Sequence, residues 1–291
     1  MSSVAVITPS YGPDFELFRD LNRSVLEWTP PDVDHHVIVP ARDRKLFGRL
    51  RGPRTEVWTV DQFVPSRMLP VPRMNMWLNV RRPYPPVRGW VMQQVVKLRA
   101  AAEIGADVLV LADSDVVFVR PVRWDTFQRD GRVRFYRNDD AVDEQLPRHL
   151  VWHHVARRML GLPPAGPPPL PDYVSALNVW DRRVVLALRD RIERVTGRPW
   201  LDAVASQLHV SEFILYGVFV DGVLGRSAQV CVADSMLCHS YWETAPLAPA
   251  AAAGFVRGLS PEDVAVMISA KSGTPVEVRR EAFRVNAGLR S

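Results

Sequence analysis

The sequence predicts an α/β protein with a mostly parallel, Rossmann-like sheet covered by helices. Two observations predict this class. Short apolar runs alternate with amphipathic stretches through the first half of the chain, which is the pattern of consecutive βαβ units. The run DVLVLA at residues 107–112 stays apolar over consecutive positions, as a strand buried on both faces does. With 291 residues and 47% hydrophobic composition, the chain can bury one sizeable core.

In the first half we expect strands at residues 4–8, 35–39, 56–60 and 107–112, with a further short strand at 116–119. Helices are expected at 14–28, 42–50 and 90–104, the last ended by Gly105 as by a C-cap glycine. Residues 64–89 hold six prolines and show little periodicity. We expect an irregular loop there, either closing over a ligand or lying passively on the surface.

The second half is less regular. Helices are expected at 149–160 and 182–196, joined by a stiff proline-rich connection, and residues 200–217 should be helical in pieces. Residues 230–242 should contain a strand or two. We expect a single domain over residues 1–245 and a helical extension over 246–291.

Composition narrows the possible classes. No apolar run approaches the roughly 20 residues needed to cross a bilayer, and the start lacks the layout of a secretory signal, so we expect a cytoplasmic protein. Cys231 and Cys238 form neither a zinc site nor a disulfide framework. The formal charge of +5 suits anionic ligands, but no nucleic-acid-binding motif accompanies it, so nucleic acid is not an expected partner.

Two acidic residues, Asp113 and Asp115, follow the most apolar strand. Carboxylates at this spacing repel one another and lose water together, and a divalent cation removes that conflict. Mg²⁺ or Mn²⁺ takes one or two protein carboxylates and completes its shell with phosphate oxygens and water. The alternative is a turn in which both residues only cap backbone amides.

Three segments then resemble GT-A glycosyltransferases, including bacterial members of that superfamily: VAVITPSY at 4–11, QQVVK at 93–97 and VLADSD at 110–115. The resemblance covers about the first 120 residues. It implies a metal-dependent transfer of a sugar from a UDP-, GDP- or dTDP-sugar to a hydroxyl of a glycan or small-molecule acceptor. Residues 1–122 would form the donor half and residues 123–245 the acceptor half of the domain.

The resemblance also nominates donor-binding residues. Those after the first strand would cradle the nucleotide, and those of the helix and the acidic motif would reach the diphosphate or the sugar: Thr8, Pro9, Ser10, Tyr11, Gln93, Gln94, Lys97, Asp113 and Ser114. Ser175 and Asn178, in YVSALNVWD, would contact the donor sugar. Each group has a structural alternative. Residues 8–11 could form an ordinary turn, the residues at 93–97 could lie on a solvated helix face, and Ser175 and Asn178 could belong to a buried strand.

Catalytic and metal roles follow from the same resemblance. Glu212, in SEFILYG, would bind or deprotonate the acceptor hydroxyl, and Asp115 would act through the metal. His239 would be the third protein ligand beside Asp113 and Asp115. The alternatives are a first-turn helix carboxylate for Glu212 and a hydrogen-bonded core residue for His239.

Two other functions stay open. Asp113 and Asp115 also match the Asp-x-Asp-x-[Thr/Val] pattern of haloacid dehalogenase-like phosphohydrolases, in which the first aspartate is the nucleophile. A non-catalytic nucleotide-binding or glycan-binding module would keep the same fold. Stereochemistry, donor and oligomeric state do not follow from the sequence.

Overall fold

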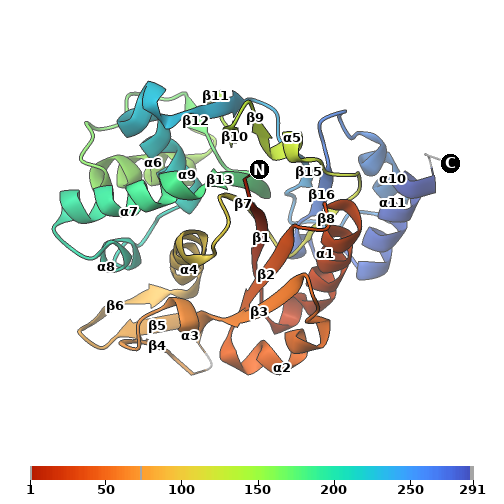
Figure 1. The fold of residues 1–291 in the computed structure, drawn as a ribbon, viewed down its shortest axis with the longest axis horizontal. Coiled ribbons are helices and arrows are strands. Elements are labelled where there is room, and N and C mark those ends of the chain that lie inside the picture. The colour runs from red at the N-terminus through yellow and green to blue at the C-terminus, as the bar shows by residue number, and fades with distance from the viewer. Residues whose placement is uncertain (1, 73, 289–291) are drawn as a thin grey trace.

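The computed structural model describes residues 2–72 and 74–288. Its centre is a five-stranded sheet in the order β13-β7-β1-β2-β3 (Figure 1). The strands are β1 (Val4–Pro9), β2 (Asp34–Val39), β3 (Thr55–Thr59), β7 (Val108–Ala112) and β13 (Leu177–Asp181). Only β13 runs antiparallel to its neighbour among them. The predicted fold class, α/β with a parallel-rich sheet, is therefore confirmed.

Helices cover both faces of the sheet, because successive residues of a buried strand point to opposite sides. In β1, Ala5 and Ile7 belong to one apolar core, and Val4 and Val6 belong to the other. The first core packs against α4 (Gly89–Glu103), α7 (Arg182–Thr196), α8 (Trp200–Ala205) and α9 (Glu212–Phe219). The second packs against α1 (Phe15–Trp28). The helices expected at 14–28, 90–104 and 182–196, and the helical pieces within 200–217, are confirmed.

The expectation of an irregular loop over residues 64–89 was wrong. After α3 (Val60–Phe63), the chain forms an antiparallel sheet of β4 (Met68–Pro70), β5 (Met76–Asn79) and β6 (Arg82–Arg88). Met68 and Val87 bury their side chains in the first core, and Arg67 pairs with Asp202 at 2.9 Å. These contacts order the segment. Its six prolines mask the alternation of apolar and polar residues by which a strand is recognised.

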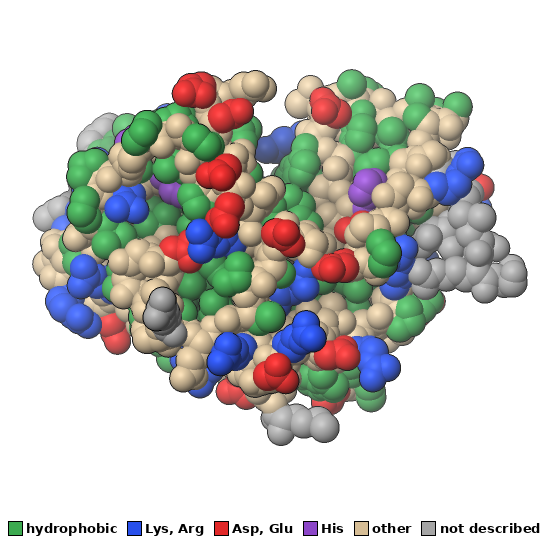
Figure 2. Space-filling view, turned by 90° about the horizontal axis from the view of Figure 1, so that it is seen from above, with side chains coloured by type: hydrophobic (Ala, Val, Ile, Leu, Met, Phe, Trp, Pro, Cys, Tyr) green, Lys and Arg blue, Asp and Glu red, His purple; other side chains and the backbone are tan. Residues whose placement is uncertain are grey.

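The second half adds short strands and helices around the central sheet. Strand β10 (Arg132–Tyr136) pairs with β9 (Gln128–Arg129) and β14 (Val230–Ala233), and β11 (Asn138–Val142) pairs with β12 (Leu170–Asp172). The helices here are α5 (Trp124–Phe127) and α6 (Pro147–Met159), and α2 (Arg44–Phe47) lies between 3₁₀ turns in the first half. Figure 2 shows a notch between two parts of the molecule, bordered by acidic side chains.

The segment beyond residue 246 holds a strand that the sequence did not reveal. Besides α10 (Pro249–Arg257) and α11 (Val276–Gly288), it contains β16 (Ala265–Ile268). This strand lies between β8 (Val116–Phe118) and β15 (Cys238–Tyr241). The extension is thus bound into a sheet with the strand that follows the acidic motif (Figure 1). No helix within the described residues has the length and apolarity that crossing a membrane requires.

Candidate functional site

Four elements meet around the acidic motif at the carboxyl end of β7 (Figure 1). They are the loop after β1, helix α4, the first turn of α9 and the turn after β16, and each contributes a side chain or an amide that contacts the motif or its partner Lys97. The carboxyl ends of parallel strands are where such sheets bind ligands. The topology therefore places the motif where a ligand site is expected.

Lys97 is the centre of this arrangement. Its Nζ lies 3.1 Å from Asp113 Oδ1, 3.0 Å from Glu212 Oε1 and 4.7 Å from the centre of the Phe213 ring. The lysine is 4% exposed and Glu212 is 2% exposed. Burial alone lowers the pKa of Lys97, but the charges of Asp113 and Glu212 outweigh it and leave that pKa raised. Lys97 is therefore a buried, permanently protonated cation that bridges two carboxylates.

Asp113 is the more accessible member of the acidic pair. Its side chain is 37% exposed, and its backbone N–H donates to the carbonyl of Ala176 at 3.2 Å, just before β13. Its Oδ1 accepts a hydrogen bond from the Lys97 ammonium. Asp113 thus combines a fixed backbone with a carboxylate that water or a ligand can reach.

Asp115 is held by the turn after β16. Its Oδ2 accepts the backbone N–H of Ala270 at 2.6 Å. Burial, and next the charge of Asp113, raise the pKa of Asp115 to about 6, although the amide bonds and Arg279 oppose this. At neutral pH the side chain is ionised and carries an incompletely compensated charge.

A third acidic residue, Asp14, joins the pair from the loop after β1. Its Oδ2 accepts the hydroxyl of Ser114 at 3.1 Å. Burial raises the pKa of Asp14, the Ser114 bond and Arg279 lower it, and the charge of Asp113 raises it further, so that the net shift is upward. We call Asp14, Asp113, Asp115, Glu212, Lys97 and Arg279 the acidic corner. Its four carboxylates face two cations, so two formal negative charges remain.

Within the described residues, no group of three or more His, Cys, Asp or Glu side chains is arranged to hold a metal ion. Asp113 and Asp115 nevertheless fit a hard cation that takes two protein carboxylates and completes its shell with phosphate and water. Both are oxygen donors, and an ion there would meet the excess negative charge. An ion held by these two residues would need further ligands from a substrate and water.

The structure brings together six of the residues nominated from the sequence, listed here in chain order: Gln94, Lys97, Asp113, Ser114, Asp115 and Glu212. Gln94 donates to the carbonyl of Trp90, and its side-chain oxygen lies 3.5 Å from the backbone nitrogen of Glu212. Ser211 caps α9 by accepting the N–H of Ile214. The side chain of Glu212 therefore starts a helix and reaches back to Lys97 at the same time.

Residues after β1 lie at the correct edge of the sheet, but Thr8 faces inward. It is fully buried, and its hydroxyl is 3.0 Å from His35 Nε2. Pro9 ends β1, Ser10 is 8% exposed with its backbone N–H bonded to Ile38, and Tyr11 is 45% exposed. Tyr11 is thus the most accessible side chain of this group for contact with a ligand.

The remaining nominated residues make other contacts. Gln93 is exposed on α4, and Ser175 bonds within its own turn to Leu177. Asn178 lies inside β13 and donates to the carbonyl of Tyr173 at 2.8 Å. The ring of His239 packs against Phe255 with centroids 4.4 Å apart. In the described part of the chain, no hydrogen bond or ion pair joins His239 to either aspartate of the motif.

Sequence reasoning missed Asp14, Ala270 and Arg279. Asp14 could have been found, because it is the one acidic residue between the first strand and the first long helix. Ala270 acts through its backbone, and Arg279 lies 164 positions beyond Asp115 in an amphipathic segment with no motif. The pairing of β8 with β16 brings those two residues to the site.

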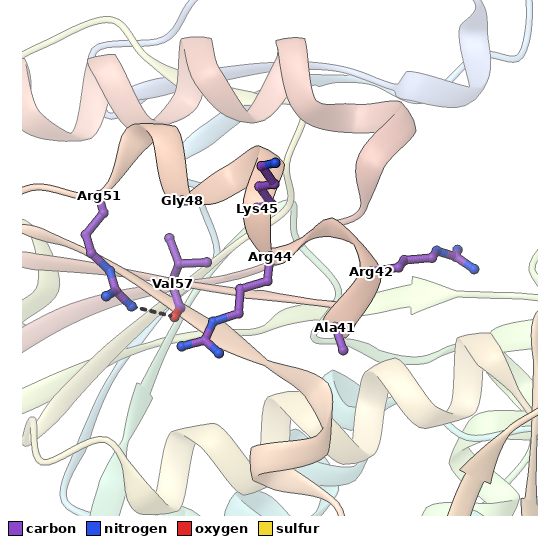
Figure 3. Close-up of a pocket in the computed structure, with 7 residues that line it drawn as sticks. All are labelled: Ala41, Arg42, Arg44, Lys45, Gly48, Arg51 and Val57. Carbon is purple, nitrogen blue, oxygen red and sulfur yellow. Dashed lines mark hydrogen bonds between the residues drawn. The ribbon is translucent and has the colours of Figure 1, made fainter.

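A hollow of about 450 Å³ is lined by none of the acidic-corner residues. Its lining is Ala41, Arg42, Arg44, Lys45, Gly48, Arg51 and Val57 (Figure 3). Arg51 donates to the carbonyl of Val57 at 3.3 Å, while Arg42 and Lys45 point away from Arg44 and Arg51. Two of the four exposed cations therefore turn away from the others, as on a solvated basic face, so the chemistry of the acidic corner identifies the candidate site better than cavity size does.

Fold and site together define an α/β protein with an acidic, lysine-bridged site at the carboxyl edge of a parallel sheet. A family model described as a family of unknown function, DUF6492, matches residues 12–248. The chain belongs to this family.

Other comparisons add little about activity. No curated protein matches the chain. Among solved structures, one of an active-site mutant of LgtC, a GT-A glycosyltransferase, is similar with a TM-score of 0.47 and 14% sequence identity. The alignment covers 98% of this chain and 95% of that one. Neither value transfers an activity to this protein.

Proposed function

We propose that the protein is a metal-dependent glycosyltransferase that moves a sugar from a nucleoside-diphosphate sugar to an acceptor hydroxyl. The observation that carries the proposal is the acidic corner at the end of β7. There Asp113 pairs with a buried lysine, the Ala270 amide holds Asp115, and the four carboxylates of the acidic corner face two cations, Lys97 and Arg279. The sequence resemblance described above supplies the reaction class.

The charge imbalance supports a divalent ion. Two formal negative charges remain after Lys97 and Arg279 are counted. Burial is the main cause of the raised pKa values of Asp14 and Asp115, and the charge of Asp113 adds to both. A bound Mg²⁺ or Mn²⁺ would neutralise charge on the diphosphate as it leaves. Asp113 and Asp115 would hold that ion, and the half-exposed Asp113 would meet it first.

Lys97 supplies fixed positive charge at the same place. Because it is buried and held by two carboxylates, its ammonium is oriented before any ligand arrives. A preorganised cation stabilises a developing anion without the cost of reorganising solvent. Tyr11, which is exposed in the loop after β1, would stack on the nucleotide base.

Glu212 has two roles in the proposal. In the ligand-free arrangement it positions Lys97, since the two side chains are buried together at 3.0 Å. To accept a proton from an acceptor hydroxyl it must exchange that contact for one with the acceptor. A ligand that draws Lys97 toward Asp113 and the diphosphate would release Glu212 for this step.

A thermal-shift series tests the function. UDP-, GDP- and dTDP-sugars are each added with Mn²⁺ and with EDTA, because a ligand that binds the native state raises the melting temperature. We expect a shift with one donor class that requires Mn²⁺ and is lost in Asp113→Asn. Turnover of a phosphate ester without any nucleotide-sugar shift would favour a phosphohydrolase. Binding without hydrolysis or transfer to any acceptor would favour a non-catalytic module.

A further inference from the structure

Arg279 is a buried arginine on α11, and its guanidinium donates hydrogen bonds to the backbone of one short segment. The residue is 3% exposed. Its Nε donates to the carbonyl of Thr274 at 2.9 Å, Nη2 donates to that of Ser269 at 2.8 Å, and Nη1 donates to that of Ile268. The planar fork of the guanidinium can satisfy three carbonyls in fixed directions, which a lysine cannot do. Arg279 therefore fixes the path of the backbone from residue 268 to 274.

That segment delivers the amide that holds Asp115. Strand β16 pairs with β8 so that Met267 faces Val116, and the chain turns immediately afterwards. In this turn the N–H of Ala270 donates to Asp115 Oδ2 at 2.6 Å across 155 positions of sequence. The orientation of the Asp115 carboxylate is thus set by a turn that is itself set by Arg279.

The guanidinium also lies close enough to act on the carboxylates by its charge. Burial lowers the pKa of Arg279, and the charges of Asp115 and then Asp14 oppose that lowering. Arg279 in turn lowers the pKa of each of those aspartates. Arg279 is thus a second buried cation of the acidic corner, and it acts on Asp14 and Asp115 by its charge.

We propose that Arg279 is a positioning residue for the metal site, acting through the turn at residues 268–274 and the Ala270 amide on Asp115. The inference rests on the proposed metal-dependent function. It assigns a role to residues outside the family match, which ends at residue 248. In this protein the C-terminal extension completes the site.

Two variants separate this role from general stability. Arg279→Lys keeps the charge but loses the fork. Ala270→Pro removes the N–H that Asp115 accepts and puts the ring Cδ in its place, and the local backbone allows the substitution. Ala270 is the first residue of a 3₁₀ turn, where proline is tolerated, and Ser269 before it has φ −52° and ψ 130°, which suit a residue preceding proline. Arg280→Gln is the matched control, since the neighbouring Arg280 pairs with Asp20 and Glu16 on α1.

The measurement is the Mn²⁺ dissociation constant by EPR titration on the full chain, with the nucleoside diphosphate present. We expect Arg279→Lys and Ala270→Pro each to weaken Mn²⁺ binding about 10-fold to 100-fold, the usual range for groups that orient a metal ligand. Arg280→Gln should stay within about twofold of the wild-type protein, because it touches none of these groups.

The outcomes distinguish the two proposals. If wild-type protein binds no Mn²⁺, the proposed function fails, and this inference fails with it. If wild-type protein binds Mn²⁺ and a folded Ala270→Pro variant binds it equally well, only the positioning role is overturned. Should Arg279→Lys not fold, the Ala270→Pro result alone decides.

Discussion

Replacing Lys97 by methionine is the perturbation that most directly tests the architecture of the acidic corner. Methionine keeps the length and the apolar stem but removes the ammonium from between Asp113 and Glu212. Glu212 is 2% exposed and would keep a charge with no partner, whereas the half-exposed Asp113 can turn to water. The cost should therefore come mainly from Glu212.

The size of the effect follows from the geometry. At an effective dielectric constant of 20, two charges about 3 Å apart attract by roughly 5 to 6 kcal/mol before desolvation is considered. Breaking a buried pair by removing one partner costs about 3–5 kcal/mol, because the remaining charge is stranded. We expect Lys97→Met to lower the free energy of unfolding by that amount in urea denaturation.

The double variant supplies the control. Lys97→Met with Glu212→Gln removes both buried charges, and we expect it to recover most of the loss. A cost below about 1 kcal/mol for the single variant, or no recovery in the double variant, would refute the claim that a buried ion pair joins α4 to α9.

Two further predictions concern the sheet and the helix packing around the site. Burial lowers the pKa of His35 to about 3, so its stabilising contribution is complete above the ordinary value of 6.5 and is lost as the pH falls toward 3. Urea unfolding should show about 2 kcal/mol less stability from this residue at pH 5 than at pH 7.5, and His35→Gln should remove that difference. Gly217→Ala would place a Cβ 2.1 Å from the Tyr173 ring, so we expect a loss of about 3 kcal/mol or more, whereas Gly105→Ala, with nothing within 4 Å, should change the melting temperature little.

Much of the central architecture could be predicted because local patterns of apolar residues indicate its strands and helices. Residues 107–112 are apolar at successive positions, and the expected strand there is the buried β7. Helix α4 shows the expected stripe of Val91, Val95 and Leu98, all buried. The acidic pair and Lys97 could be assigned to one site because the strand before the pair and the helix that carries Lys97 were each recognisable from the sequence.

Other features depend on pairings that no local pattern encodes. Strand β16 is short, and only its position between β8 and β15 identifies it as part of a sheet. Through that pairing the amide of Ala270 reaches Asp115, and the guanidinium of Arg279 holds the turn that carries this amide. The bond between Thr8 and His35 is likewise a contact between strands, which turns a nominated ligand residue toward the core. The features that could not be predicted from the sequence are those that depend on contacts between residues far apart in the chain.

The central claim is that one divalent ion joins Asp113 and Asp115 to the diphosphate of the donor. Pulsed EPR of protein-bound Mn²⁺ in the presence of a nucleoside diphosphate tests it most directly, because a phosphate oxygen on the ion gives a ³¹P hyperfine coupling. We predict that wild-type protein shows this coupling on a protein-bound ion and that Asp113→Asn loses the protein-bound signal. A protein-bound Mn²⁺ without ³¹P coupling, or a coupling unchanged in Asp113→Asn, would contradict the claim.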